Sequence, residues 1–475
     1  MKRSFLFCFA IIMLLSFKEN IKASVFDTTY ARILQTKIEQ LKSSYSLVGI
    51  SAAAYVPGQG TWEGTAGISS SDSDKMNSEM VFGSGSITKN WIAAIILQLE
   101  EADSLSLDDP LSNWLPQYQN IPDSVTLKQM LNHTSGIFNV TDNQIFINAI
   151  FSNVKRLWTI EEVLTGGYVL QPYFSPGTSF HYSNTNYMIL GLIISRIMHT
   201  SLADQFRQRF FIPLDLSESY FETDDTVKSP FAHNWSDIGN GFEDIFYLPV
   251  TAFNSSTIGA GGVICTPENL VRYINNLFDG KIIGSNSLGQ MLTFRSVNIA
   301  GANGYGLGTM RYNVSGVSCY GHGGNSLGYS SVMIYNPVDS ISIAIMTNKD
   351  INAAPIGISF LQTVMQNNPS GLFQISSQVT EKFLLKQNYP NPFNPVTQVE
   401  FEISKVGFVS LNVFDALGKE VMTLVNEIKP AGSYKVEFNG SSLSSGIYFY
   451  KLVVSLSNPI EAGNFTQTKR MLLLK

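Results

Sequence analysis

Hydrophobic and polar positions follow two different periods along residues 25–368. Apolar residues recur at helical spacing in three segments, which predicts helices over residues 28–44, 87–102 and 352–368. Short runs rich in Val, Ile, Ala and Tyr predict strands over residues 47–56, 60–69, 311–321, 329–337 and 341–348. Strands near both ends with helices between them indicate one large α/β or α+β domain, in which a single sheet brings the two ends together.

The pattern changes to strict alternation in the last 90 residues. Pro390, Pro392 and Pro395 exclude regular structure at the start of this region. Five period-2 runs follow, separated by Gly, Asn and Ser, at residues 397–404, 407–415, 433–440, 446–454 and 469–475. This spacing of short strands predicts a separate, small β-sandwich.

The first 23 residues, "MKRSFLFCFAIIMLLSFKENIKA", combine two cations, a short apolar run and a small residue at the end. This order is typical of a secretory signal peptide, and the run is shorter than the ~20 apolar residues of a membrane span. An uncleaved N-terminal anchor is the alternative. We expect the mature protein to be soluble and exported.

Composition removes several classes of function. The 475 residues hold 31 Lys and Arg against 37 Asp and Glu, a net charge of −6 with no long basic run, so nucleic acid is not an expected partner. The five histidines form no close ligand pair and there is no CxxC, so neither metal nor organic cofactor is expected. Cys265 and Cys319 follow the signal peptide, and the sequence leaves open whether they pair.

The segment "VFGSGSITKNW" contains the first candidate for chemistry. Two glycines allow a tight turn before an apolar helix, which places the Ser86 hydroxyl at a helix N-terminus. Lys89 lies one turn later on the same face, and an apolar environment favours its neutral amine, a base toward the hydroxyl. The alternative is an ordinary cap serine beside a solvated lysine.

A second candidate nucleophile is Ser326, in "GNSLG", which matches the G-x-S-x-G elbow of α/β-hydrolases. That elbow requires a histidine later in the chain. The last histidine is His322, which precedes Ser326. The order of residues therefore argues against Ser326.

Five motifs in fixed order resemble the serine β-lactamase and penicillin-binding-protein superfamily, closest to class C β-lactamases, D-alanyl-D-alanine peptidases and related esterases. They are "FGSGSITK", "LNHTSGI", "FHYSNTNYMILG", "GGVICTPENLVRYINNL" and "YGHGGNSLGYSS". The resemblance covers about residues 25–368. It implies an α+β fold with an antiparallel sheet flanked by helices and a helical subdomain.

The resemblance also implies roles for individual residues. Ser86 corresponds to the acylated nucleophile, Lys89 to its proton-accepting partner and Tyr182 to the group that shuttles protons. Asn184 would position the substrate. Tyr182 can serve at neutral pH if cations favour its phenolate or if a network holds its proton, and Lys89 and His322 are the available cations.

The "HGG" segment supplies the remaining implied residues. His322 stands where many β-lactamases have Lys, and Gly323 and Gly324 let the strand lie close to a substrate. The backbone N–H groups of Ser86 and Asn325 would form the oxyanion hole. Gly323 replaces the Thr or Ser that often binds a substrate carboxylate, which favours esters or amides lacking that group.

His133, in "NHTSG", is interpreted as a structural residue that fixes a loop, because the other groups already supply acid and base.

The tail resembles the C-terminal sorting domain of the type IX secretion system, through "LKQNYPNPFNPVTQVEFEI", "AGSYKVEF" and "LSSGIYFYKL". This implies interaction with the secretion machinery and a secreted or cell-surface location. The alternative is a β-sandwich that binds carbohydrate or packs on the enzyme.

The sequence thus predicts a signal peptide (1–23), a hydrolase domain (24–368), a linker (369–383) and a sorting domain (384–475). The expected activity is hydrolysis of a small-molecule or peptide substrate, cell-wall fragments included, through a Ser86 acyl-enzyme, as an esterase, a D-amino-acid peptidase or a β-lactamase. The alternative is an inactive homologue that binds peptidoglycan or peptide.

Overall fold

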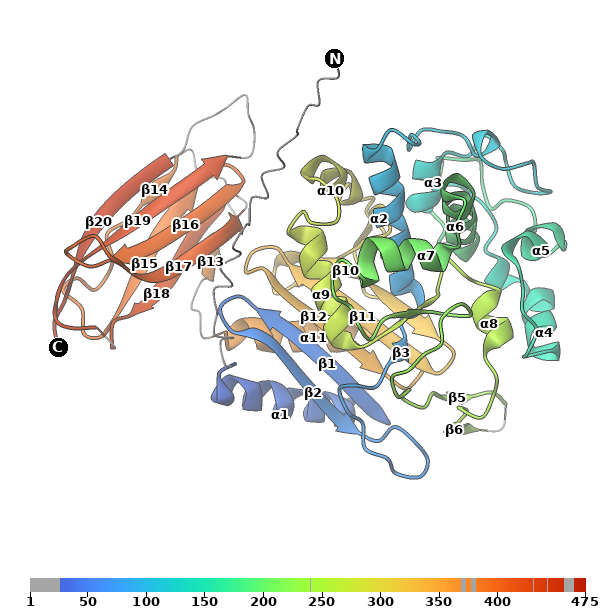
Figure 1. The fold of residues 1–475 in the computed structure, drawn as a ribbon, viewed down its shortest axis with the longest axis horizontal. Coiled ribbons are helices and arrows are strands. Elements are labelled where there is room, and N and C mark those ends of the chain that lie inside the picture. Colours follow the sequence, from blue (N-terminus) through green and yellow to red (C-terminus); the bar gives the residue numbers. More distant parts are fainter. Residues whose placement is uncertain are drawn as a thin grey trace, which may run out of the picture.

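The computed structural model describes residues 26–239, 241–368, 373–376, 382–429, 431–441, 443–456 and 465–475. The predicted signal peptide lies outside these residues. The chain forms an α+β part followed by an all-β part (Figure 1).

A seven-stranded antiparallel sheet organises the α+β part, in the order β2-β1-β12-β11-β10-β9-β8. Its strands are β1 (Gly49–Val56), β2 (Gly60–Gly67), β8 (Gly304–Tyr305), β9 (Met310–Val314), β10 (Val317–Ser326), β11 (Tyr329–Asn336) and β12 (Ile341–Thr347). The first strand pairs with the last one, with Ile50 opposite Thr347. The expectation of one sheet that joins the two ends of the domain is confirmed.

Helices cover both faces of this sheet. On one face lie α1 (Thr28–Ser44) and α11 (Ala354–Gln366), which contact each other (Figure 1). The buried residues of α1 recur every three to four positions, so its apolar stripe faces the sheet: Tyr30, Leu34, Ile38 and Leu41. On the other face, α9 (Pro267–Phe278) packs on β1, β11 and β12.

The helical subdomain is built around α2 (Thr88–Glu101), which is buried on nearly all sides as its apolar sequence predicts. Around it lie α3 (Leu127–Leu131), α4 (Gln144–Ser152), α5 (Ile160–Thr165), α6 (Asn184–Met198), α7 (Leu202–Phe206), α8 (Thr251–Ser255) and α10 (Ser285–Met291). A small sheet of β3 (Phe82–Gly83), β7 (Val263–Cys265) and β4 (Tyr220–Phe221) joins this subdomain to the large sheet; β5 (Trp235–Asp237) and β6 (Phe242–Asp244) form a hairpin.

The all-β part consists of two four-stranded sheets, β13-β18-β15-β14 and β17-β16-β19-β20, which share one apolar core. Its strands are β13 (Phe373–Ser376), β14 (Leu384–Leu385), β15 (Val396–Ile403), β16 (Gly407–Phe414), β17 (Glu420–Lys429), β18 (Gly432–Asn439), β19 (Gly446–Leu456) and β20 (Phe465–Leu473). Three strands were not predicted. β17 lies between two expected runs, the two-residue β14 precedes the prolines, and β13 lies inside the predicted linker yet pairs with β18.

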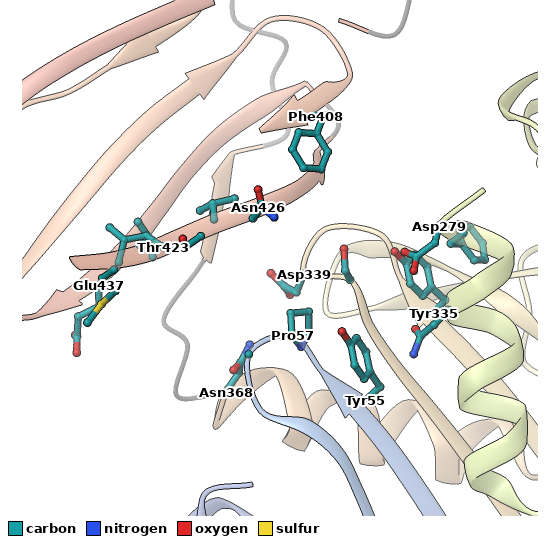
Figure 2. Close-up of a pocket in the computed structure, with 18 of the residues that line it drawn as sticks. Tyr55, Pro57, Asp279, Tyr335, Asp339, Asn368, Phe408, Thr423, Asn426 and Glu437 are labelled. Carbon is teal, nitrogen blue, oxygen red and sulfur yellow. The ribbon is translucent and has the colours of Figure 1, made fainter. Parts of the chain in front are cut away.

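The two parts meet at the turn between β11 and β12. Val338 of this turn joins the core of the sandwich, and its carbonyl accepts a hydrogen bond from Lys429. Beside this contact, residues of both parts line a cavity of about 1000 Å³, with Tyr55 and Asp339 on one side and Thr423 and Asn426 of β17 on the other (Figure 2).

Cys265 and Cys319 are separate buried thiols, so the structure contains no bond between them. Within the residues that the structure describes, no helix is both long enough and apolar enough to cross a membrane.

Candidate active site

Ser86 lies where the small sheet passes into the subdomain's central helix. β3 leads through a 3₁₀ turn (Gly85–Ile87) into α2, so Ser86 precedes the helix by two residues, as the sequence predicts. Gly85 has a φ of +54°, and a Cβ there would lie 2.4 Å from the Asn325 carbonyl oxygen. Only glycine therefore allows this loop to approach β10 so closely. Ser86 itself is partly exposed.

Lys89 brings its amine to the Ser86 hydroxyl. Nζ lies 2.8 Å from Ser86 Oγ and donates a hydrogen bond to the Ala260 carbonyl at 2.8 Å. The side chain is completely buried. Burial lowers the pKa of the Lys89 ammonium well below its usual value, because the charged form loses its hydration. The neutral amine that can accept the Ser86 proton is thereby favoured.

The Ala260 loop is held beside Ser86 by the small sheet. Gly83 of β3 pairs with Ile264 of β7, and Ser84 N–H donates to the Val263 carbonyl at 2.9 Å. Strand β7 thus fixes the distance between the nucleophile loop and the carbonyl that orients Lys89.

Tyr182 lies just before α6 and faces the same amine. The Lys89 Nζ lies 4.9 Å from the centre of its ring. Burial raises the pKa of Tyr182, and hydrogen bonding with the Ser86 hydroxyl offsets only part of this rise. The phenol is therefore protonated at neutral pH, and its proton is available to a leaving group.

His322 belongs to a buried chain of hydrogen bonds rather than acting as a cation. Its Nε2 lies 3.0 Å from the Tyr305 hydroxyl, and that hydroxyl lies 3.2 Å from His133 Nε2. Burial, together with the charge of Lys89, lowers the pKa of His322 to about 3. Burial thus favours the neutral imidazole, which supplies no positive charge to Tyr182.

The donors and acceptors between His133, Tyr305 and His322 follow from the other hydrogen bonds of the two histidines. His133 Nδ1 accepts hydrogen bonds from Ser183 N–H and the Asn186 amide, so its proton is on Nε2, which donates to Tyr305. Tyr305 then donates to His322 Nε2, and His322 Nδ1–H faces the Gly323 carbonyl at 2.5 Å. His133 therefore ties the loop before α6 to β8.

The open edge of β10 faces the nucleophile loop. Two-residue loops at 315–316 and 327–328 close hairpins with β9 and β11, so hydrogen bonding alternates along β10 and the Asn325 N–H points away from β11. Pairing with β9 ends at Gly321. A Cβ on Gly85 would lie 2.8 Å from Asn325 N, so this free edge lies against the Ser86 loop.

Gly324 and Gly323 differ in how much space surrounds them. A Cβ on Gly324 would lie 2.0 Å from the Ser84 carbonyl oxygen, whereas a Cβ on Gly323 would make ordinary contacts at 3.7 Å. Close approach of the strand thus requires glycine at position 324 and not at position 323.

Two other predicted residues lie at the edge of this arrangement. The Asn184 amide donates to Thr141 Oγ1 at 3.0 Å, and its backbone N–H donates to Asn139. Ser326 ends β10 at a hairpin rather than at a strand-to-helix elbow. No histidine is hydrogen-bonded to it among the described contacts.

The sequence missed two participants, the Ala260 carbonyl and Tyr305. A backbone oxygen has no residue signature, and Tyr305 reaches the site only because β8 pairs with β9 at the edge of the sheet. No group of three or more His, Cys, Asp or Glu in the described chain is arranged to hold a metal ion.

Two known protein families match separate parts of this chain. The family model described as "Beta-lactamase" matches residues 34–357, about two thirds of the chain, including Ser86, Tyr182 and the "HGG" strand. The chain belongs to the β-lactamase family of serine hydrolases. A second model, the secretion system C-terminal sorting domain, matches residues 387–460 and implies secretion through the type IX system.

Among curated relatives of this β-lactamase family member, penicillin-binding protein 4 of Amycolatopsis lactamdurans is 26% identical over 336 residues, covering 66% of this chain and 84% of that protein. Penicillin-binding protein 4* of Bacillus subtilis (strain 168) is 24% identical over 292 residues, covering 58% of this chain. That match spans 62% of the Bacillus protein's own length.

Among solved structures, a D-stereospecific amidohydrolase from Streptomyces sp. is 27% identical with a TM-score of 0.60, covering 67% of this chain and 94% of that one. A D-amino acid amidase from Ochrobactrum anthropi SV3 is 22% identical with a TM-score of 0.64, covering 71% and 99%. The second likeness concerns the fold alone. Together they confirm the predicted β-lactamase/transpeptidase-like fold.

Proposed function

We propose that this protein is an exported hydrolase that forms an acyl-enzyme on Ser86 and transfers the acyl group to water. The observation that carries the proposal is the 2.8 Å separation of Ser86 Oγ from a completely buried lysine amine. The amine has no acidic partner among the described ion pairs, and burial alone accounts for its lowered pKa. A neutral amine at this distance is the base that an alcohol nucleophile needs.

In the first half of the reaction, the Lys89 amine accepts the proton of the Ser86 hydroxyl while Oγ attacks the substrate carbonyl carbon. The backbone N–H groups of Ser86 and Asn325 donate to the developing oxyanion, and one such donor is typically worth ~10² to 10³ in rate. Tyr182 gives its proton to the leaving group and regains one from Lys89. The C–N or C–O bond then breaks.

In the second half, water replaces the leaving group. The Lys89 amine accepts the proton of the attacking water, relayed by the Tyr182 phenol, which gives up its own proton as it receives one. The same proton is returned to Ser86 Oγ as the acyl bond breaks. The chain from His133 through Tyr305 to His322 keeps the neutral His322 ring in place beside Gly323, with no proton transfer required of it.

The substrate class that we propose is an amide or ester without a carboxylate next to the scissile bond, D-configured amides and peptides included. The absence of a side chain at Gly323 supports the first part. The 27% identity to a D-stereospecific amidohydrolase supports the second. Asn184 is proposed to contact the substrate after releasing Thr141.

For localisation, we propose a signal peptide at residues 1–23, export through the type IX machinery by residues 384–475, and release or display at the cell surface. Fusing residues 384–475 to a periplasmic reporter in a host with this system tests the second step. The reporter is expected outside the cell, and retention in the periplasm would contradict the proposal.

The activity is tested with the chain from residue 24 onward, on p-nitrophenyl esters, D-amino acid amides, D-Ala-D-Ala peptides and a chromogenic cephalosporin. Ser86→Ala is expected to abolish turnover and labelling by a fluorophosphonate. Ser84→Ala is the matched control, because no hydrogen-bond partner of its hydroxyl is present among the described residues.

Activity that survives Ser86→Ala contradicts the nucleophile. If no substrate is turned over and no acyl-enzyme mass forms, a binding function for peptidoglycan or peptide replaces hydrolysis.

A further inference from the structure

A second cavity begins one residue beyond the proposed oxyanion hole. It has a volume of about 170 Å³, and its lining includes Gly83 of β3 and Ser326 of β10. Phe231, Phe246 and Ile264 give it apolar walls. A space of this size accommodates one side chain or short aliphatic chain rather than a whole drug-sized ligand.

One acidic side chain, Glu222, lies in this otherwise uncharged lining. Glu222 follows β4, its backbone N–H is held by the Gly262 carbonyl at 2.7 Å, and 8% of the residue is exposed. Within the described residues, no hydrogen bond or ion pair reaches its carboxyl group. The neighbouring Tyr329 hydroxyl is already used, since it donates to the Ala232 carbonyl.

An acid without a partner in such a place is costly to the fold. Burial raises the pKa of Glu222 to about 8, because the carboxylate loses its hydration and gains nothing in return. A glutamine or leucine would serve packing better. The carboxyl group of Glu222 therefore points to a binding partner that is not part of the folded chain.

The cavity lies on the acyl side of the proposed reaction. His322, Gly324 and Ser326 alternate onto one face of β10, the face toward Ser86. Tyr182 and His322 lie near each other at one end of this row, with ring centres 6.5 Å apart, and Ser326 is at the other end. The leaving group must lie near Tyr182, which protonates it, so the acyl chain extends toward Ser326.

We propose that this cavity binds an aliphatic chain of the acyl group that ends in a primary ammonium, and that Glu222 is the residue that selects it. The inference rests on the proposed function, because it assigns the acyl side of the same site. The apolar walls contact the methylene groups, as they do for buried lysine stems. The ammonium supplies the hydrogen bonds and the charge that Glu222 lacks.

The test uses p-nitrophenyl esters of ω-amino acids with six, eight and ten carbons, each beside the unsubstituted ester of the same length and the ω-hydroxy ester. The full chain from residue 24 is assayed at pH 7.5. For at least one length, we expect the ammonium ester to exceed the unsubstituted ester in kcat/KM by about 10-fold or more, the usual range for a hydrogen bond to a charged group. In Glu222→Gln this ratio should fall to about 1.

Glu79→Gln is the matched control, because it removes the same charge from an exposed position seven residues before Ser86. In Glu79→Gln, the ratio of kcat/KM for the ammonium ester to that for the unsubstituted ester should equal the ratio in the unsubstituted protein. The same ratio in the unsubstituted protein, Glu222→Gln and Glu79→Gln, or a preference for the ω-hydroxy ester, would overturn the proposal. Fluorophosphonate labelling of Glu222→Gln shows whether the variant is folded around Ser86.

A binding measurement keeps the inference separate from the proposed function. Hexylammonium should raise the Tm of the unsubstituted protein more than 1-hexanol does, and Glu222→Gln should lose the difference. If no ester is hydrolysed but this difference is present, the hydrolase proposal fails and the ammonium site stands. If esters are hydrolysed by a Ser86-dependent route and the difference is absent, the ammonium site fails alone.

Discussion

Lys89 and Lys429 are both buried completely, but they lie in different parts of the molecule. Each amine donates to a backbone carbonyl, Ala260 for Lys89 and Val338 for Lys429. Each also lies near a tyrosine ring, with Nζ 4.9 Å from the centre of Tyr182 and 5.9 Å from that of Tyr434.

The Lys89 amine lies 2.8 Å from the Ser86 hydroxyl, whereas Lys429 lies at the contact between the two parts of the molecule. Burial therefore does not by itself identify a catalytic lysine. The serine hydroxyl beside Lys89 supports its proposed catalytic role, whereas Lys429 connects the two parts of the molecule.

The largest effect on kcat/KM should come from replacing Lys89 by methionine, an apolar residue of similar length, with the same replacement of Lys429 as the comparison. Lys89→Met is expected to lower kcat/KM by about 10³-fold or more, because the base is lost. Its Tm should stay equal or rise, since a buried charge-bearing group is replaced by an apolar one. Lys429→Met should keep kcat/KM within about twofold. If Lys89→Met retains a tenth of the activity, the comparison between the two lysines fails.

The next largest effect concerns the strand that closes the site around Lys89. Gly324→Ala should lower kcat/KM by about 10²-fold, because its Cβ would push β10 away from the Ser84 carbonyl and displace the Asn325 donor. Gly323→Ala is the paired control, since a Cβ there makes ordinary contacts, and it should change kcat/KM less than about threefold. Similar losses of kcat/KM in both variants would contradict this explanation, because only the Cβ at position 324 collides with the Ser84 carbonyl.

A third buried ionisable group, Glu222, sharpens the comparison through pH. Its pKa is raised to about 8 in the folded protein, so the folded state holds a proton that the unfolded state releases above its ordinary pKa. Stability is therefore lost as the pH rises from about 4.5 to about 8. Glu222→Gln should remove this loss. At pH 8.5 its free energy of unfolding should exceed that of the unsubstituted protein by on the order of 1 to 4 kcal/mol.

That difference should shrink toward zero at pH 4.5. Urea unfolding at the two pH values measures it, with Glu79→Gln as the control. A difference that does not change with pH would contradict the buried, unpartnered state of Glu222.

The smallest effect should come from removing the β-sandwich. The sandwich contacts the turn at Val338, and the eight residues of β11 separate this turn from the Ser326 hairpin, about 25 Å. A chain from residue 24 that ends at Asn368 should keep kcat/KM within about twofold of the full chain. A loss of more than 10-fold would mean that Lys429 and its domain support the site across the sheet.

Much of this architecture was predictable because its signals are local. Helix α1 has the predicted bounds, and its stripe of buried residues is the one that the spacing indicates. Strands β15, β16 and β18 of the sandwich follow strict alternation, since one face of each lies in the shared core. β17 was missed because "EVMTLVNEIK" departs from this alternation. β13 and β14 were missed because four and two residues carry too little pattern.

The site was predictable in its residues but not in its electrostatics. The order of motifs indicated Ser86, Lys89, Tyr182 and His322, and the fold brings their side chains into one cluster. The charge of His322 could not be read from its type, because it depends on complete burial and on Tyr305, which arrives from another strand. Glu222 carried no signal at all, since its neighbours in the cavity come from five distant segments.

The pairing of β1 with β12 has a consequence for when this protein can act. Ile50 finds its partner, Thr347, only about 300 residues later in the chain. Ser86 is therefore synthesised early, but the sheet that contains Asn325 is completed only when β12 has been added. Any polypeptide interrupted before residue 341 carries the proposed nucleophile without a finished sheet, so the proposed acylation requires the α+β part to be synthesised through β12.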